Sequence, residues 1–349
     1  MPATGIRPTI RDMAGYVPGE QINDPDVAKL NTNENPYPPS PKVFEAVRAV
    51  LTGDKLRKYP QPLGDSFRKV AGRVFGIDPD SILIGNGSDD ILTILTRAFV
   101  PEGGKIASLT PSYILYKSLA EIQGATFETV PFSADWKLPT EWPLTGSHIT
   151  FLANPNSPSG TAIRLNEIER FASQTGGPLV VDEAYADFAE WNSLKLVSRV
   201  KNVIVTRTLS KYYALAGVRF GFAIADPGTV RELIKVKDSY NCDVLSLAAA
   251  TAAIDDQGYY ADLRSKITAT RGRLTVALAE LGFHVTPSQS NFVWCRRPDR
   301  PVKPIFEELK NRKILIRYMN YANYGEGLRI SVGTPAEVER LIRELKTIV

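Results

Sequence analysis

The chain contains very little cysteine and histidine. Of its 349 residues, only Cys242 and Cys295 are cysteines, and only His148 and His284 are histidines. Two thiols so far apart suggest neither a disulfide framework nor a metal-binding spacing, and they are typical of buried thiols in a cytosolic protein. So few histidines, each in a run typical of a strand, argue against a metal centre and against a Ser-His-Asp hydrolase.

Features of membrane, secreted and nucleic-acid-binding proteins are also missing. No apolar run approaches the length that spans a membrane, and residues 1–10 contain no apolar segment of the kind found in secretory signals. The formal net charge is only +4, and lysines and arginines are scattered among acidic residues without a dense basic run. We therefore expect a cytoplasmic enzyme that binds neither membrane nor nucleic acid, with a mild positive charge suited to anionic substrates.

What is present is an ordinary globular composition with regular alternation of strands and helices. The chain is 43% hydrophobic and 23% charged, and its length suits one large and one smaller domain. Strands are predicted at 81–84, 105–109, 126–130, 148–152, 179–182, 203–206 and 218–224. Helices are predicted at 41–51, 67–75, 89–99, 113–123 and 167–173. Such alternation predicts an α/β fold with a mostly parallel sheet between helices.

The C-terminal third has a different pattern. A helical stretch runs from Pro227 toward Ile254 and another covers 260–281. Strands at 283–286, 291–295, 314–317 and 328–332 flank a helix at 302–312. The capping box at Thr334 and Glu337 predicts a final helix over 335–348. We expect a smaller α+β domain over 241–349, a large domain over 41–240, and an N-terminal segment, 1–40, that joins the small domain and covers the active site.

Lys211 ends an apolar strand run with the sequence Thr-Leu-Ser-Lys. Ligands of α/β proteins bind at the carboxyl edge of the sheet, where burial and nearby cations lower the pKa of an amine enough for Schiff-base formation. Most lysines are solvated surface charges, so Lys211 gains significance only from the other loops.

Those loops carry further polar groups. Glycines at 85 and 87, followed by Ser88 and Asp89, suit a phosphate at a helix N-terminus, although an ordinary Gly-rich turn has the same composition. Asp182 ends a buried strand and needs a partner there, whether a structural arginine, a backbone amide or a bound heterocyclic cation. The loop 154–160 contains two asparagines, and its prolines and glycine make it a rigid loop that can hold an amide side chain against a ligand.

An aromatic residue and an arginine complete this set. Tyr113 begins a helix after a strand and either stacks on a planar ring or packs in the core. Arg219 follows Lys211 by eight positions. An amine, a buried carboxylate, a phosphate-suited turn, an arginine, an amide and an aromatic ring on successive strand ends are together what pyridoxal 5'-phosphate (PLP) requires.

In these motifs the sequence resembles the fold type I PLP-dependent aminotransferases, and among them the histidinol-phosphate branch. The matching stretches are 30–36, 59–60, 87–89, 111–113, 154–160, 182–185, 208–211 and 328–333. The resemblance implies transfer of an amino group in two half-reactions, with histidinol phosphate and 2-oxoglutarate giving imidazole-acetol phosphate and glutamate.

The resemblance also implies roles for individual residues at the cofactor. Lys211 would form the Schiff base and carry the proton, Asp182 would keep the pyridine ring protonated, and Tyr185 would bond the 3'-oxygen. The phosphate would be bound by Gly87, Ser88, Asp89, Ser210 and Arg219, with Tyr113 on the ring. Where most relatives have an asparagine, this chain has Ser157, so either Asn156 or Ser157 is left to contact the 3'-oxygen.

Substrate and partner residues follow in the same way. Tyr16, Asn35, Arg317 and Arg329 would bind the substrate, the two arginines by bidentate contacts to carboxylate or phosphate, although Arg317 also fits a surface charge at a strand end. Tyr59 would reach the phosphate of a neighbouring subunit, which implies a homodimer with shared active sites.

Two related activities and one unrelated one stay open at this stage. An aromatic-amino-acid aminotransferase would share nearly every motif, and a threonine-phosphate decarboxylase would share the lysine, the aspartate and the phosphate residues. A non-catalytic paralogue or nucleic-acid binder would be expected to lack Lys211 or Asp182 and to have a continuous basic face.

Overall fold

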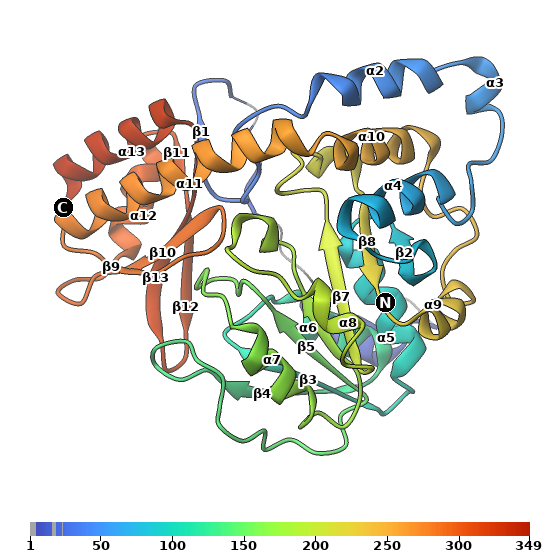
Figure 1. The fold of residues 1–349 in the computed structure, drawn as a ribbon. Coiled ribbons are helices and arrows are strands. Elements are labelled where there is room, and N and C mark those ends of the chain that lie inside the picture. The colour runs from blue at the N-terminus through green and yellow to red at the C-terminus, as the bar shows by residue number, and fades with distance from the viewer. Residues whose placement is uncertain (1–4, 16–18, 23) are drawn as a thin grey trace.

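A seven-stranded sheet forms the centre of the protein (Figure 1), and the computed structural model describes residues 5–15, 19–22 and 24–349. In spatial order its strands are β2 (Ile82–Gly85), β8 (Gly221–Ile224), β7 (Val203–Thr208), β6 (Leu179–Asp182), β5 (Ile149–Ala153), β3 (Lys105–Thr110) and β4 (Thr126–Pro131). The strands from β7 to β4 pair in parallel, whereas β8 is antiparallel to both of its neighbours. The predicted α/β fold with a mostly parallel sheet is confirmed.

Helices cover both faces of this sheet, because alternate residues of each buried strand point to opposite sides. In β6, Leu179 and Val181 pack in one apolar core, whereas Val180 packs in the other. The core around Val180 is completed by α5 (Ser88–Phe99), α6 (Leu115–Gln123) and α9 (Pro227–Ile234). The core around Val181 is completed by α2 (Pro41–Val50), α4 (Asp65–Phe75), α7 (Leu165–Ala172), α8 (Leu194–Val197), α10 (Val244–Asp255) and α11 (Gln257–Glu280).

The same alternation sorts the polar residues where β6 and β7 end. Asp182 pairs in register with Thr206, and both side chains lie on the α6 side of the sheet, since Tyr116 of α6 and Thr206 both donate to Asp182. The next residues, Glu183 and Arg207, form an ion pair, and the Arg207 guanidinium lies 5.9 Å from the ring of Phe75 in α4, on the opposite side. Because side chains alternate along a strand, Asp182 and Thr206 lie on one side of the sheet, and the buried ion pair of Glu183 and Arg207 lies on the other.

The C-terminal part forms an antiparallel sheet with its own core. Its strands, in spatial order, are β12 (Arg317–Tyr321), β13 (Gly325–Ser331), β10 (Phe292–Arg296) and β9 (His284–Thr286). Helices α12 (Lys303–Asn311) and α13 (Pro335–Ile348) and the end of α11 pack against it. The predicted capping box of α13 is confirmed, with Thr334 and Glu337 bonded reciprocally.

The N-terminal segment lies against this C-terminal part. Strand β1 (Ala28–Lys29) pairs in parallel with β11 (Ile314–Leu315). Besides β1 and α2, the described part of the first sixty residues contains the short helices α1 (Pro8–Asp12) and α3 (Gly53–Leu56). No helix in the described part of the chain is long and apolar enough to cross a membrane.

Two predicted elements are each divided in the structure. The helical stretch expected from Pro227 toward Ile254 is broken between α9 and α10, because Asp243 caps α10 by accepting from the Leu245 and Ser246 amides. The single strand expected over 314–317 is split, since Ile314–Leu315 pairs with β1 and Arg317 begins β12. Both breaks come from pairing and capping partners rather than from the apolar pattern.

Candidate active site

A cavity of about 630 Å³ lies at the carboxyl edge of the seven-stranded sheet. Three parts of the chain line it: the strand ends of the large sheet, the N-terminal segment 31–34, and strands β12 and β13. Ligands of open α/β sheets bind at this edge, and the volume suits a small molecule.

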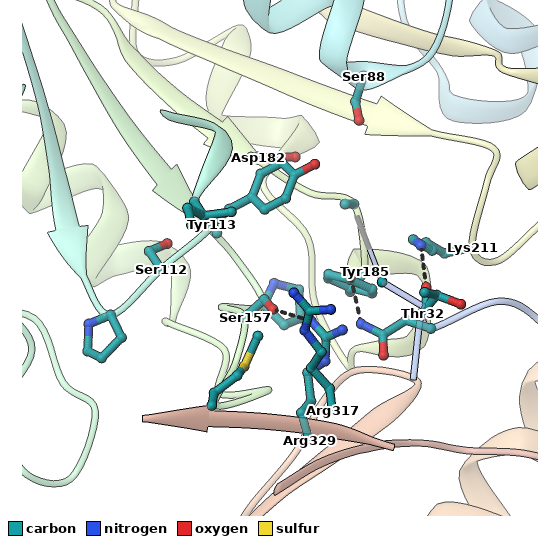
Figure 2. A pocket seen from close by; sticks show the side chains of 18 of the residues that line it. Thr32, Ser88, Ser112, Tyr113, Ser157, Asp182, Tyr185, Lys211, Arg317 and Arg329 are labelled. Atoms are coloured by element: carbon teal, nitrogen blue, oxygen red, sulfur yellow. Dashed lines mark hydrogen bonds between the residues drawn. The ribbon is translucent and has the colours of Figure 1, made fainter. Parts of the chain in front are cut away.

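Lys211 reaches into the cavity from the turn after β7. Its Nζ donates to the carbonyl oxygen of Thr32 at 3.0 Å (Figure 2). Burial lowers the pKa of Lys211 to about 8, with Arg329 and Arg219 acting in the same direction and Glu34 and Asp89 against it. Near physiological pH the amine is therefore still mostly protonated, but the neutral form, which attacks a carbonyl, is far more abundant than in an ordinary lysine.

Asp182 lies at the end of β6 and is only 4% exposed. Its Oδ2 accepts from the Tyr116 hydroxyl at 2.9 Å, and its Oδ1 accepts from the Thr206 hydroxyl at 3.2 Å. Burial raises the pKa of Asp182 to about 6, against these two hydrogen bonds, and Asp89 raises it further. A carboxylate in this position is suited to face a cation, which would replace the water lost on burial.

An anion cradle lies where α5 begins. A Cβ on Gly221 would lie 2.5 Å from the Ser88 amide nitrogen, and one on Gly87, whose φ is +83°, would lie 2.8 Å from the Arg219 guanidinium. Arg219 donates to Ser210 Oγ at 3.3 Å and pairs with Asp89 at 3.5 Å. The glycines thus allow β8 and the Arg219 guanidinium to approach the start of α5 closely. Ser88, Ser210 and Arg219 line the cavity here, beside a helix N-terminus and a guanidinium, both of which attract anions.

Two tyrosines line the cavity between the lysine and the carboxylate. Tyr113 donates to Asp89 at 3.3 Å and stands edge-on to Tyr116. The Tyr185 hydroxyl accepts from Asn33 Nδ2 at 3.0 Å (Figure 2). Burial raises the pKa of Tyr185, so the phenol keeps its proton and can donate it in a hydrogen bond.

Two arginines enter from the small sheet. Arg317 and Arg329 are direct partners across β12 and β13, and Figure 2 shows their side chains next to each other, pointing toward Ser157. Arg329 donates to Ser157 Oγ at 3.1 Å and to the Asn31 carbonyl at 2.9 Å. Two guanidinium groups in one cavity can bind a dianion or a carboxylate.

Three predicted site residues do not line the cavity. The buried amide of Asn156 bonds the Pro111 carbonyl and two serines and so holds two loops together, whereas Ser157 does line the cavity. Asn35 uses its amide on the Tyr212 carbonyl. Tyr59 is 80% exposed and stacks on Tyr240 with ring centroids 4.3 Å apart.

Tyr16 lies outside the described residues. The remaining predicted residues all line the cavity or adjoin it: Gly87, Ser88, Asp89, Tyr113, Asp182, Tyr185, Ser210, Lys211, Arg219, Arg317 and Arg329.

The structure adds cavity residues that were not among the predicted ones. Thr32 holds the lysine, Asn33 holds Tyr185, and Glu34 is bonded to Thr32 and Lys29. Asn33 also has a φ of +56°, in the left-handed region that asparagine adopts more readily than most side-chain-bearing residues. The dense run of polar residues at 31–35 could have indicated a segment that lines a site. The local sequence does not, however, indicate which carbonyl or amide group points into the cavity.

An amine of lowered pKa, a buried carboxylate and an anion cradle in one cavity define an enzyme that works on amino groups. Sequence comparison agrees, since residues 25–345 match the family of class I and II aminotransferases. The chain belongs to this family, as its motifs predicted.

Within the family the chain is similar to proteins named histidinol-phosphate aminotransferase. It is 51% identical to the one from Rhodopirellula baltica, over 95% of this chain and 92% of that protein. It is 46% identical to the one from Geotalea daltonii, over 97% of each chain. Among solved structures, the histidinol-phosphate aminotransferase of Sinorhizobium meliloti in complex with pyridoxal-5'-phosphate has a TM-score of 0.87 and 26% identity, over 99% of both chains.

Proposed function

We propose that the enzyme transfers an amino group reversibly between histidinol phosphate and 2-oxoglutarate, giving imidazole-acetol phosphate and glutamate, a reaction of histidine biosynthesis. The 51% identity to the Rhodopirellula baltica protein over nearly the full length supports the substrate. The observation that carries the proposal is that one cavity joins Lys211 and Asp182 to Arg317 and Arg329. Amine chemistry and anion recognition therefore occur side by side.

The same cavity suits PLP as cofactor. When bound, this group supplies a carbonyl that condenses with amines and a protonated ring that withdraws electrons from the substrate. The donor set fits it: a lysine of lowered pKa, a buried carboxylate for the ring nitrogen, and the part of the cavity lined by Ser88 and Arg219 for the phosphate. The relative from Sinorhizobium meliloti, which has the same fold, was solved with this cofactor.

The chemistry would rest on three side chains. Lys211 Nζ would hold the cofactor and, once released, move the proton that leaves the α-carbon of the amino donor. Asp182 would accept a hydrogen bond from the ring nitrogen and hold the proton there. Tyr185, kept in place by Asn33, would donate to the cofactor's 3'-oxygen. Ser157, rather than Asn156, is the loop residue within reach of the cavity.

Cofactor phosphate and substrate would be held by separate groups. Ser88, Ser210 and Arg219 would bind the phosphate of the cofactor, with Asp89 orienting Arg219 through their ion pair, while Tyr113 would cover the ring. Arg329 would bind the glutamate carboxylate or the phosphate of histidinol phosphate, which occupy one site in alternate half-reactions. Arg317 would add a second contact to that phosphate.

A homodimer with shared active sites belongs to the same proposal. Tyr59 projects from the surface with 80% of its area exposed and is stiffened by stacking on Tyr240, which suits a residue that reaches the phosphate in a neighbouring subunit. The division into domains at 1–40, 41–240 and 241–349 stays a prediction. Two free, buried cysteines suit a reducing compartment, and we propose the cytoplasm.

A half-reaction screen tests the substrate. Purified protein loaded with PLP is mixed separately with histidinol phosphate, glutamate, phenylalanine, tyrosine and threonine phosphate, and the cofactor's absorbance is followed to the pyridoxamine form. Rapid conversion is expected with histidinol phosphate and glutamate, and none with a Lys211→Ala control. Conversion by only the aromatic amino acids and glutamate would assign the enzyme to those substrates, and release of CO2 from threonine phosphate would make it a lyase.

A further inference from the structure

The carboxylate of Asp182 receives one hydroxyl on each of its oxygens. Tyr116 donates to Oδ2 at 2.9 Å and Thr206 donates to Oδ1 at 3.2 Å. Both donors are fully buried, and they come from different elements, α6 and β7. The two hydrogen bonds together fix the rotation of the carboxyl group, because each oxygen accepts from a different secondary-structure element.

The Tyr116 ring is itself fixed. It stacks on Phe151 with centroids 4.8 Å apart and planes 13° apart, and the Tyr113 ring meets it edge-on at 5.6 Å. Burial, together with the neighbouring Asp182 charge, raises the pKa of Tyr116 well above its ordinary value. The phenol therefore keeps its proton, and toward an ionised carboxylate it can only donate.

The groups around Asp182 divide into two sets. Burial and the charge of Asp89, from α5, both favour the protonated acid, whereas Tyr116, Thr206 and the Ala184 amide favour the carboxylate. Tyr113, which precedes α6 and which Figure 2 shows beside Asp182, donates to Asp89 at 3.3 Å. Among the groups in the described part of the chain that act most strongly on Asp182, those that oppose the cost of burying its charge are hydrogen-bond donors.

We propose that Tyr116 is a positioning residue, which together with Thr206 keeps Asp182 ionised and oriented so that the ring nitrogen of the cofactor stays protonated. The inference rests on the proposed function, since it concerns how Asp182 serves that cofactor. A carboxylate without its two donors becomes the more basic partner, and the proton shared with the ring nitrogen moves onto oxygen. The ring then withdraws electrons less strongly, although the cofactor remains bound.

A purely structural tyrosine would behave differently. If Tyr116 only fills the core, removing its hydroxyl lowers stability and leaves the protonation of the cofactor unchanged. Tyr116→Phe is the test variant, because it keeps the ring and its stacking on Phe151. Tyr260→Phe is the matched control, since Tyr260 is equally buried and its hydroxyl accepts from the Ser40 amide, with no contact to Asp182.

The decisive measurement is the 15N resonance of PLP labelled at its ring nitrogen and bound to each variant. Protonation moves this resonance far upfield. We expect the wild type and Tyr260→Phe to give the protonated position, and Tyr116→Phe and Thr206→Val to shift toward the unprotonated one. Turnover should agree, with kcat of Tyr116→Phe lower by about tenfold and KM for glutamate nearly unchanged.

A second measurement needs no cofactor. In protein labelled with 13C at aspartate carboxyls, with Asp182→Asn to assign the resonance, Asp182 should titrate with a pKa of about 6 in the wild type and at higher pH in Tyr116→Phe. An unchanged 15N position in a folded, cofactor-bound Tyr116→Phe would overturn the inference. If that variant does not fold, Thr206→Val decides in the same way. Failure of the wild type to bind PLP would instead overturn the proposed function, and this inference with it.

Discussion

Arg207 and Glu183 form an ion pair that is almost closed to solvent, with NH2 and Oε2 2.7 Å apart and side chains 2% and 0% exposed. Arg207 also bonds Asp187, and Glu183 accepts from the Ser193 amide. Burial disfavours the charged guanidinium, but Asp187 and Glu183 together hold the pKa of Arg207 above its ordinary value. Because Glu183 follows Asp182 directly, this pair fixes the backbone from which the Asp182 carboxylate projects.

Arg207→Met should therefore be strongly destabilising. It leaves two carboxylates facing a buried site without their cation, which costs about 3–5 kcal/mol. Urea denaturation gives the free energy of unfolding. The matched control is Arg199→Met, whose ion pair with Glu169 is exposed and should contribute less than about 1 kcal/mol. Equal losses in the two variants would mean that the buried pair has no special role.

Asp182→Asn should stabilise the cofactor-free protein at neutral pH while weakening the cofactor's function. The pKa of Asp182 is raised to about 6 in the folded protein. The carboxyl group therefore stabilises the folded state most at low pH, and this stabilisation is lost as pH rises toward that value. The difference between this pKa and the ordinary pKa of an aspartate corresponds to a loss of about 3 kcal/mol in the free energy of unfolding at pH 7. Urea denaturation should show that the free energy of unfolding of the variant, relative to that of the wild type, is larger at pH 7 than at pH 5. A gain independent of pH would contradict the burial of an ionised group.

Cofactor capture should follow the ionisation of Lys211. Since its pKa is lowered to about 8, the rate at which cofactor-free protein forms a borohydride-reducible adduct with PLP should rise through that pH and then level off. Glu34 raises the pKa of Lys211, so Glu34→Gln should move the rise to lower pH. Stopped-flow absorbance measures both profiles. A rise near pH 10 in the wild type would mean that the lysine is not desolvated.

The two cavity arginines should separate the two substrates. Arg317→Ala should raise KM for histidinol phosphate at least about tenfold, as expected for loss of a charged contact, with a smaller effect on glutamate. Arg329→Lys should raise KM for both, because it keeps the charge but loses the fork that bonds Ser157 and the Asn31 carbonyl. Steady-state kinetics with each substrate tests this, and equal effects of Arg317→Ala on both would exclude a phosphate-specific role.

Shared active sites would be revealed by mixing two defective chains. Lys211→Ala and Tyr59→Ala should each have little activity alone. After unfolding and refolding together, half of the dimers combine both chains, and one of their two sites is intact, so about a quarter of wild-type activity should return. No recovery, although mass measurement shows mixed dimers, would mean that Tyr59 does not serve the neighbouring subunit.

The strand ends were predictable because the buried strands of the large sheet are continuous apolar runs. Lys211, Asp182 and Ser88 each follow such a run, and the fold brings them to one cavity. The choice between Asn156 and Ser157 was not predictable, since periodicity does not extend into an irregular loop. The Asn33 bond to Tyr185 joins positions 152 residues apart, a distance over which no local pattern carries information.

The cavity carboxylate of Asp182 and the ion pair between Glu183 and Arg207 depend on one alignment of β6 with β7. Because Asp182 and Glu183 point to opposite faces, insertion or deletion of a single residue in β6 would exchange them. The guanidinium of Arg207 would then meet the wrong acid, and the cavity would contain a longer acidic side chain without its hydroxyl donors. A chain with this register shift would therefore lose both stability and activity. Selection for either property thus also maintains the register that the other requires.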